Sequence, residues 1–357
     1  MMSDMRVLGI ETSCDETAAA VVEDGRRLLS NVVASSMALH VPYGGVVPEI
    51  AARSHIEAIV PVIRQALNEA GCVWDDIDAI AVTYGAGLGG SLLIGVLTAR
   101  TLAIVHRKPL YAVNHVAGHI YANFLTGTAL PGYSLPAGQP AFPLLALLVS
   151  GGHSQLVLFR GHFDYRLLGQ TTDDAIGEAF DKVAKILGLP YPGGPSVGRK
   201  AAEGDPYAYE LPKAKMAGKY DFSFSGLKTA VLRLAQAEVG ADFTLPSYEL
   251  PARLNDRQKA DIAASFQRIA VETVVDKTLA AYEEFRPASI VIAGGVAASS
   301  ELRRQLAERL PKPITCPDLK LCTDNGAMIA TLGCYMAMRG QAAADPYTLD
   351  INPSLNM

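Results

Sequence analysis

The sequence has 357 residues, of which 50% are apolar and 19% are charged, and its formal net charge at pH 7 is −5. This composition excludes a disordered chain, and the length predicts two domains, because a single core seldom serves more than about 200 residues. The acidic balance argues against a protein that grips nucleic acid unaided, since such proteins carry a basic excess. If the ligand is RNA, local basic patches or a partner subunit must supply the positive charge.

The cysteines and the apolar runs bear on where the protein resides. The five cysteines form no Cys-x-x-Cys pair and none of the close spacings of a disulfide framework, which predicts reduced thiols in the cytoplasm. The first six residues lack the basic start and long apolar run of a signal peptide. Because no run reaches about 18 consecutive apolar residues, we expect no membrane span.

Two segments of the chain share one pattern. Residues 7–22 and residues 144–159 each contain an apolar strand, a short polar turn and a second apolar strand. The turns, residues 11–17 and 150–154, carry small hydroxyl side chains and backbone N–H groups directed at one spot, which suits phosphate. Since the pattern occurs once in each half, the sequence predicts two related lobes.

Between and beyond these segments, strand and helix periodicities alternate. Residues 56–67 predict an amphipathic helix that ends at Gly71, with Pro61 marking a kink or a later start. The alternation favours mainly parallel sheets covered by helices. The other predicted strands are residues 77–82, 110–113 and 289–293, and the other predicted helices are residues 91–107, 176–187, 262–269 and 302–310.

Two stretches show little periodicity. Residues 206–251 contain four lysines, and we interpret them as an insertion near the mouth of a cleft. The residues after Gly340 are predicted to form a surface strap.

Residues 85–90, Gly-Ala-Gly-Leu-Gly-Gly, match the GxGxxG pattern between a predicted strand and a predicted helix. A dinucleotide site also needs an acidic residue at the end of the next strand to bind the ribose, but that place holds Asn114 and His115. We therefore do not expect NAD to bind here. Tight packing of strand on helix, and anion binding at the helix N-terminus, remain open.

His115 and His119 have the i, i+4 spacing that places two imidazoles on one helix face, close to a strand end where α/β sheets bind ligands. Asp324, before a predicted helix, is the candidate third ligand. Two histidines and a carboxylate suit iron(II) or zinc(II). The alternatives are core or capping histidines and an ordinary helix cap at Asp324. A zinc peptidase is excluded, because Val116 stands where its catalytic Glu is required.

Three glycine pairs occur in the second half of the chain, at residues 151–152, 193–194 and 294–295. Paired glycines let a flat base or a sugar approach the backbone closely. Each pair alone is also compatible with a plain turn, but three of them in one half favour a nucleotide-like ligand.

Seven segments in chain order resemble the universal tRNA N6-adenosine threonylcarbamoyltransferase family, once mislabelled as an O-sialoglycoprotein endopeptidase. The segments are residues 9–17, 44–49, 114–119, 148–153, 180–185, 222–228 and 322–326. The family belongs to the actin–hexokinase–heat-shock ATPase superfamily. The resemblance therefore implies a two-lobed actin-like α/β fold, with duplicated lobes and a ligand cleft between them. Residues 1–125 would form lobe I, with residues 325–357 packing back on it, and residues 126–324 would form lobe II.

The resemblance also implies the reaction. A partner enzyme makes threonylcarbamoyl-adenylate, and the family passes its threonylcarbamoyl group to N6 of the adenosine 3′ of the anticodon, in tRNAs that read codons beginning with A. By the motif match, His115, His119 and Asp324 hold one divalent metal per subunit, iron(II) with zinc(II) as the alternative. The metal would polarise the carbamoyl carbon.

The motif match assigns the remaining site residues. The acyl-adenylate would contact Leu148, Val149, Ser150, Gly151 and Gly152, with Asp181 and Gly194 on the ribose side and Ser299 in the adenosine turn. Ser299 is a departure, because the family usually has Asn there. A general base would be Asp15 or Glu16, on the first polar turn, and the sequence does not choose between them.

The implied partners are tRNA, a non-catalytic paralogue of similar fold (TsaB-like) and a small ATPase (TsaE-like), with no membrane. The apolar helix at residues 56–67 would offer the paralogue a face. Two alternatives compete with the transferase: a nucleotide-dependent kinase of the same superfamily, and a non-catalytic scaffold of a tRNA-modifying complex.

Overall fold

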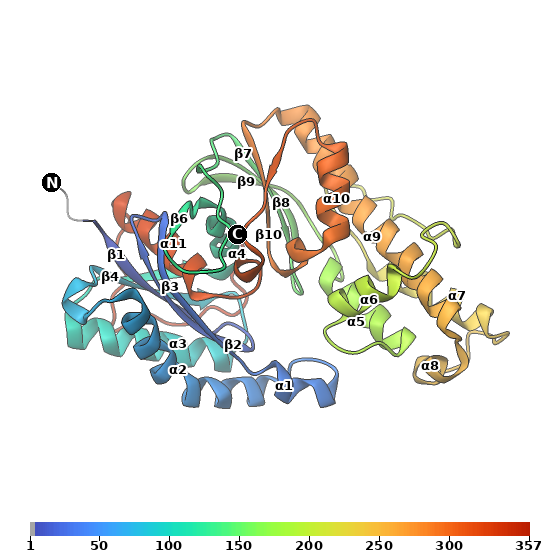
Figure 1. Ribbon diagram of the computed structural model, residues 1–357, viewed down its shortest axis with the longest axis horizontal. Coiled ribbons are helices and arrows are strands. Elements are labelled where there is room, and N and C mark those ends of the chain that lie inside the picture. The colour runs from blue at the N-terminus through green and yellow to red at the C-terminus, as the bar shows by residue number, and fades with distance from the viewer. Residues whose placement is uncertain (1–3) are drawn as a thin grey trace. The chain divides into compact units, whose positions relative to one another are not determined.

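The computed structural model describes residues 4–357, which divide into two compact units (Figure 1). Unit 1 combines the residues up to Pro140 with Cys316–Met357, and unit 2 is Ala141–Thr315. These bounds differ from the predicted ones, which placed residues 126–324 in the second lobe. Residues 127–128 pair with the first sheet, and Asp318 accepts a hydrogen bond from Ser134, so both connecting segments lie with unit 1.

Unit 1 is built on a six-stranded mixed sheet in the order β5-β4-β1-β2-β3-β6. β1 to β3 form an antiparallel meander, and β4 and β5 extend it on the β1 side as parallel strands. Every residue of β2 is buried, because helices cover both faces of the sheet. The strands are β1 (Arg6–Glu11), β2 (Glu16–Glu23), β3 (Arg27–Ser35), β4 (Ala79–Gly85), β5 (Leu110–Asn114) and β6 (Gly127–Thr128).

The two faces of this sheet are covered by different parts of the chain. Leu8 and Ile10 of β1 lie in a buried cluster with Ile59 of helix α2 (Pro48–Ala70), which packs beside α3 (Gly89–His106). Gly9 faces the opposite way, toward α11 (Gly326–Met338), where a Cβ would lie 2.4 Å from the backbone of Ala330. Successive side chains of β1 point to opposite faces of the sheet. Helices α2 and α3 therefore cover one face, and α11 covers the other.

Helix α2 begins at Pro48, well before the predicted position, and runs through Pro61 to end at Gly71, whose φ of 64° is left-handed. The later start considered at Pro61 is therefore wrong, while the predicted end is confirmed. By length and average hydropathy alone, helix α3 could cross a membrane. Its apolar residues are interrupted by polar ones, so it contains no long run of consecutive apolar residues. It packs against β4 and α2 within unit 1.

Unit 2 repeats the arrangement of unit 1. Its sheet has the order β11-β10-β7-β8-β9, in which β7 to β9 form an antiparallel meander and β10 is parallel to β7. The predicted duplication is confirmed, but the prediction of mainly parallel sheets is wrong, since both sheets contain a meander. The strands are β7 (Leu144–Val149), β8 (Ser154–Gly161), β9 (Asp164–Gln170), β10 (Ser289–Ala293) and β11 (Ile314–Thr315).

The main helices of unit 2 are α5 (Ile176–Leu187), α6 (Gly193–Ala201), α7 (Ser225–Glu238), α9 (Asp256–Phe285) and α10 (Ser300–Arg309). Helix α7 lies within the stretch interpreted as an insertion, and it buries Leu227, Val231 and Ala235. That stretch is therefore partly a packed helix. Unit 1 adds the short helix α4 (His115–Tyr121), which follows β5 directly.

Candidate functional site

The predicted metal ligands lie together in unit 1. His115 and His119 project from α4 one turn apart, and Asp324 comes from the turn before α11. The Nε2 atoms of His115 and His119 lie 3.5 Å and 3.2 Å from Oδ1 of Asp324. Ligand atoms bound about 2.0–2.2 Å from one ion lie roughly 3.0–3.5 Å from each other, and both distances to Asp324 fall in this range. The three ligand atoms all lie within 4.8 Å of one another, so the cluster is a candidate site for one small divalent ion.

Helix capping orients both ligand-bearing turns. Asn114, the last residue of β5, accepts hydrogen bonds through Oδ1 from the backbone N–H groups of Val116 and Ala117, at 2.8 Å and 3.2 Å. Asn325 caps α11 in the same way, accepting from Met328 at 3.0 Å. Both asparagines are adjacent to a ligand, so each cap fixes the backbone from which that ligand projects.

Glu11 contacts His115 at Nδ1, the ring nitrogen that is not the candidate ligand atom. It ends β1, is completely buried, and places Oε2 3.1 Å from Nδ1 of His115. The same oxygen accepts a hydrogen bond from Thr83 Oγ1, and Oε1 accepts one from the backbone of Ser13, both at 2.5 Å. A carboxylate at Nδ1 keeps the proton on that nitrogen and leaves Nε2 as the ligand atom. The motifs of the sequence do not assign this role to Glu11.

The charges of this cluster depend on one another. Burial alone would lower the pKa of His115, but the carboxylates of Asp324 and Glu11 outweigh it and raise that pKa to about 9. Burial would likewise raise the pKa of Glu11, but the charge and hydrogen bond of His115 hold it below its ordinary value. In the metal-free chain at neutral pH, His115 is therefore an imidazolium beside two carboxylates.

The two candidate bases, Asp15 and Glu16, lie where β2 begins. Burial raises the pKa of Glu16 to about 10, with the charges of Asp324 and Asp15 and a hydrogen bond to Asp15 adding to the shift. Ser35 Oγ donates to Glu16 Oε1 at 3.3 Å. The neutral form of Glu16 is therefore favoured, and Glu16 is hydrogen-bonded to Asp15.

The predicted adenylate residues all lie in unit 2. Leu148 and Val149 end β7 and are buried, and Ser150, Gly151 and Gly152 form the turn to β8. The start of α5 fits tightly under this turn, because a Cβ at Gly177 would lie 2.6 Å from Ser150 O. Gly294, with φ of 87°, approaches from β10, where a Cβ would lie 2.5 Å from Val149 O.

Asp181 and the second glycine pair are linked directly. Asp181, one turn after Gly177 on α5, accepts a 2.6 Å hydrogen bond from the backbone N–H of Gly193. Burial raises the pKa of Asp181, and that hydrogen bond opposes the shift. In the described chain, a Cβ at Gly194 would have no atom within 4 Å, so this glycine borders open space. Ser299 caps α10, accepting from Leu302 N–H at 3.3 Å.

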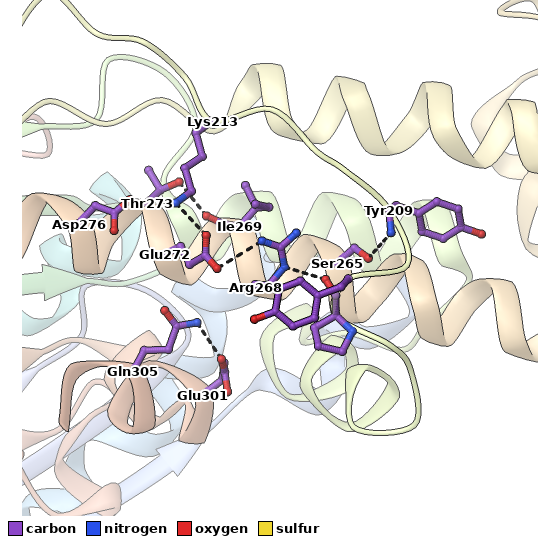
Figure 2. Close-up of polar contacts among 12 residues, drawn as sticks. Tyr209, Lys213, Ser265, Arg268, Ile269, Glu272, Thr273, Asp276, Glu301 and Gln305 are labelled. Carbon is purple, nitrogen blue, oxygen red and sulfur yellow. Dashed lines mark hydrogen bonds and ion pairs between the residues drawn. The ribbon is translucent and has the colours of Figure 1, made fainter. Parts of the chain in front are cut away.

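A cavity of about 720 Å³ is lined by residues of α6, α9 and α10, and none of the predicted adenylate residues is among them. Its lining includes Gly198, one turn after Gly194, and Ser300, next to Ser299. The volume is in the range of small-molecule sites. Figure 2 shows how its walls are braced: Glu272 of α9 pairs with Lys213 at 2.8 Å and with Arg268 at 3.3 Å.

The same bracing extends to the loop before α7 and to α10. Arg268 donates to the carbonyl of Pro206 at 2.7 Å, and Tyr209 N–H donates to Ser265 Oγ at 3.2 Å (Figure 2). On α10, Gln305 donates to Glu301 at 2.8 Å. Pro206 and Tyr207, at the start of the stretch interpreted from sequence as an insertion, thus line the cavity, while Tyr209 and Lys213 pack on α9.

Comparison with known proteins identifies the family. Residues 27–331 match the family described as TsaD, tRNA N6-adenosine threonylcarbamoyltransferase. A protein of that name from Thermomicrobium roseum is 53% identical over 346 residues, covering 95% of this chain and 94% of the relative. Another from Symbiobacterium thermophilum is 51% identical over 354 residues, covering 98% and 96%.

Solved structures agree in fold. HypF from T. kodakarensis is 15% identical with a TM-score of 0.59, covering 97% of this chain and 49% of that protein. Full-length HypF in a phosphate- and nucleotide-bound form is 13% identical with a TM-score of 0.56, covering 95% and 47%. At such identities the likeness concerns the fold alone, and the predicted actin-like α/β fold is confirmed. The match along the chain and the identity of about half its residues show that this protein belongs to the tRNA N6-adenosine threonylcarbamoyltransferase family.

Proposed function

We propose that this chain transfers the threonylcarbamoyl group from threonylcarbamoyl-adenylate to N6 of the adenosine 3′ of the anticodon, in tRNAs that read codons beginning with A. Its family is named for transfer to N6 of adenosine in tRNA. The observation that carries the proposal within the chain is the convergence of His115, His119 and Asp324. A kinase would instead hold Mg²⁺ with carboxylates and water, and a scaffold would not need this set.

The proposed chemistry begins at the carbamoyl carbon, because an exocyclic amine is a poor nucleophile. A bound divalent ion, iron(II) or alternatively zinc(II), would polarise and orient the threonylcarbamoyl oxygens. His115, His119 and Asp324 would hold it, one ion per subunit. Glu11 retains the proton on Nδ1 of His115, so that Nε2 faces the ligand position.

Proton removal from N6 is assigned to Asp15. Burial, with the nearby charges of Asp324 and Asp15, raises the pKa of Glu16 and so disfavours Glu16 as the base. A general base needs to be ionised when the amine attacks. In this proposal Glu16 hydrogen-bonds to Asp15 and orients it, and Asp15 takes the proton. As N6 bonds to the carbamoyl carbon, the bond from that carbon to the phosphate oxygen breaks and AMP leaves.

The adenylate is proposed to bind unit 2 through its backbone turns. Ser150, Gly151 and Gly152 would contact its phosphate, since this turn is open to solvent at both glycines. Asp181 and Gly194 would contact the ribose, and Leu148, Val149 and Ser299 would complete the site. The cavity beyond Gly198 would then receive the adenine end.

The proposed partners follow from charge and exposed surface. The net charge of −5 disfavours tight binding of tRNA by this chain alone. Ile56 and Val60 of α2 are 61% and 49% exposed, and Leu97 of the adjacent α3 is 45% exposed. We propose that a non-catalytic paralogue (TsaB-like) covers this face, and that a small ATPase (TsaE-like) completes a cytoplasmic complex. Efficient multiple turnover by the chain alone at physiological salt would count against this.

The test of the activity combines metal analysis with a transfer assay using preformed adenylate and tRNA. His115→Ala and His119→Ala should each abolish bound metal and transfer, while circular dichroism stays unchanged. The matched control is His106→Ala, whose imidazole stacks on Trp74 at 3.9 Å, away from the cluster. Full metal occupancy in the double histidine variant would refute the site assignment.

A further inference from the structure

The GxGxxG turn between β4 and α3 is filled by the chain's own C-terminus. Asn352 N–H donates to Tyr84 O at 2.7 Å, and Gly87 N–H donates to Pro353 O at 3.2 Å. A Cβ at Gly85 would lie 2.1 Å from Asn352 O and 2.8 Å from Leu355 Cβ. The close approach that the glycines permit is therefore used by residues 352–355, and no space for a pyrophosphate remains there.

The other side of this turn contacts Ser13, a neighbour of the candidate metal ligand His115. Leu88 N–H donates to Ser13 O at 2.8 Å, and a Cβ at Gly87 would lie 2.6 Å from the same oxygen. Ser13 Oγ in turn lies 3.1 Å from Nδ1 of His115. The turn is thus held between the C-terminal residues and Ser13, which contacts the candidate ligand.

A second route reaches the same histidine. Asn114 Nδ2 donates to the carbonyl of Asn356 at 3.2 Å, while its Oδ1 caps α4. One amide therefore joins the C-terminus to the first turn of the helix that carries His115 and His119. The side chain can make both contacts only while Asn356 is in place.

The C-terminal residues are anchored upstream of these contacts. Arg100 of α3 donates to the carbonyls of Pro346, Tyr347 and Leu349, at 2.6, 2.6 and 3.1 Å. Ala344 N–H donates to Leu110 O at 2.7 Å on the edge strand β5. Residues 344–349 thus hold the chain so that residues 352–356 reach the turn and Asn114. The sequence predicted a surface strap after Gly340 but not these contacts.

We infer that residues 352–356 are a positioning element of the metal site, acting on His115 through Asn114 and through the turn at Gly85–Leu88. The inference rests on the proposed function, since it concerns the same three ligands. Without these residues the ligands remain present, but the first turn of α4 and Ser13 lose their outer support. Residues 352–356 therefore influence the metal affinity of the site and its coordination geometry.

The experiment compares the full chain with a chain ending at Ile351, using Co²⁺ as the probe. Affinity for Co²⁺ should fall roughly ten- to a hundred-fold, as is typical when supporting contacts of a ligand are lost. The visible absorption bands of bound Co²⁺ should also change, which a general loss of stability would not produce. The control ends at Asn356, lacks only Met357, and should bind like the full chain.

A second variant keeps the test valid if the shortened chain does not fold. Asn114→Ser retains a helix-capping oxygen but cannot reach Asn356, so it should reproduce part of the loss. In the shortened chain it should have no added effect, because the contact is already gone. Equal Co²⁺ affinity and spectra in full and shortened chains would overturn the inference. Absence of Co²⁺ binding by the full chain would instead refute the proposed metal site itself.

Discussion

Oε2 of Glu11 lies 3.1 Å from Nδ1 of His115, although the two residues are 104 positions apart in the chain. The contact joins the end of β1 to the first turn of α4. It gives the candidate metal site a buried anion that is not itself among the three ligands. Several measurable properties of the site depend on this pair.

Replacing Glu11 by Gln should weaken metal binding. The amide has nearly the same shape but lacks the charge that keeps the Nδ1 proton of His115 in place, so affinity should fall roughly ten- to a hundred-fold. Competition with a chelating dye measures it. Glu23→Gln is the control, since Glu23 is also buried but pairs with Arg6 and Arg27. A similar loss in both variants would contradict the assigned role.

Metal affinity should rise with pH. The pKa of His115 in the metal-free fold, about 9 against an ordinary 6.5, means that the metal displaces a proton at neutral pH. Affinity should therefore climb by up to about tenfold per pH unit and level off above pH 9. The raised pKa also stabilises the metal-free fold fully below pH 6.5, and this stabilisation is lost as pH rises through 9. Calorimetric titrations from pH 6.5 to 9.5 test the first point, and a flat profile would contradict it.

The two acidic residues at the start of β2 should respond differently to neutralisation. Asp15→Asn should slow single-turnover transfer by roughly 10²- to 10⁴-fold, as expected for loss of a general base. Glu16→Gln should retain most of the rate, because a protonated Glu and a Gln offer similar hydrogen bonds. The assay uses preformed adenylate and tRNA in excess of enzyme. The reverse order of effects would assign the base to Glu16.

Asp181→Asn should weaken binding of a non-hydrolysable adenylate analogue by about 1.5–3 kcal/mol, the range for a hydrogen bond to a charged group. Asn keeps an acceptor for Gly193 N–H, so the turn should stay in place, whereas Ala would also release the turn. Isothermal titration calorimetry measures the loss. Glu178→Gln, which removes an exposed ion pair with Lys182 on the same helix, should bind the analogue normally.

Gly177→Ala should disrupt the first adenylate turn. The added Cβ would lie 2.6 Å from Ser150 O and 2.9 Å from Gly151 Cα, so the turn has to move, at a cost of about 1–3 kcal/mol in unfolding free energy. Urea unfolding measures this cost, and analogue binding should weaken in parallel. Gly226→Ala is the control, because a Cβ there has no atom within 4 Å in the described chain. If Gly177→Ala bound the analogue with unchanged affinity, the turn of residues 150–152 would not be part of the adenylate site.

The duplicated strand–turn–strand pattern could be predicted because β1, β2, β7 and β8 each contain an apolar run and are buried along most of their length. The third strand of each meander was not predicted, since β3 alternates buried with half-buried residues and β9 is mostly exposed. Helix α7 was missed for the same reason, because only one narrow stripe of it is buried. Elements that face solvent leave a weaker apolar signal than those covered on both sides.

The site shows a similar division. His115 and His119 could be found by local spacing, but Glu11 and Asn114 act through partners far along the chain, which no local pattern reveals. The predicted boundary at residue 324 would have left Asp324 in the second lobe. Its contacts with His115 and His119 place it in unit 1.

Unit 1 is made from two stretches of chain with all of unit 2 between them. During synthesis, the strands of its sheet leave the ribosome early, whereas α11, which covers one sheet face, and Asp324 are made late. Unit 2 is continuous and can complete its core first. The ligand set of the candidate metal site is therefore incomplete until translation has passed Asp324, just before α11. A nascent chain halted within unit 2 would carry both histidines but not Asp324, so it would lack the full ligand set of the candidate site.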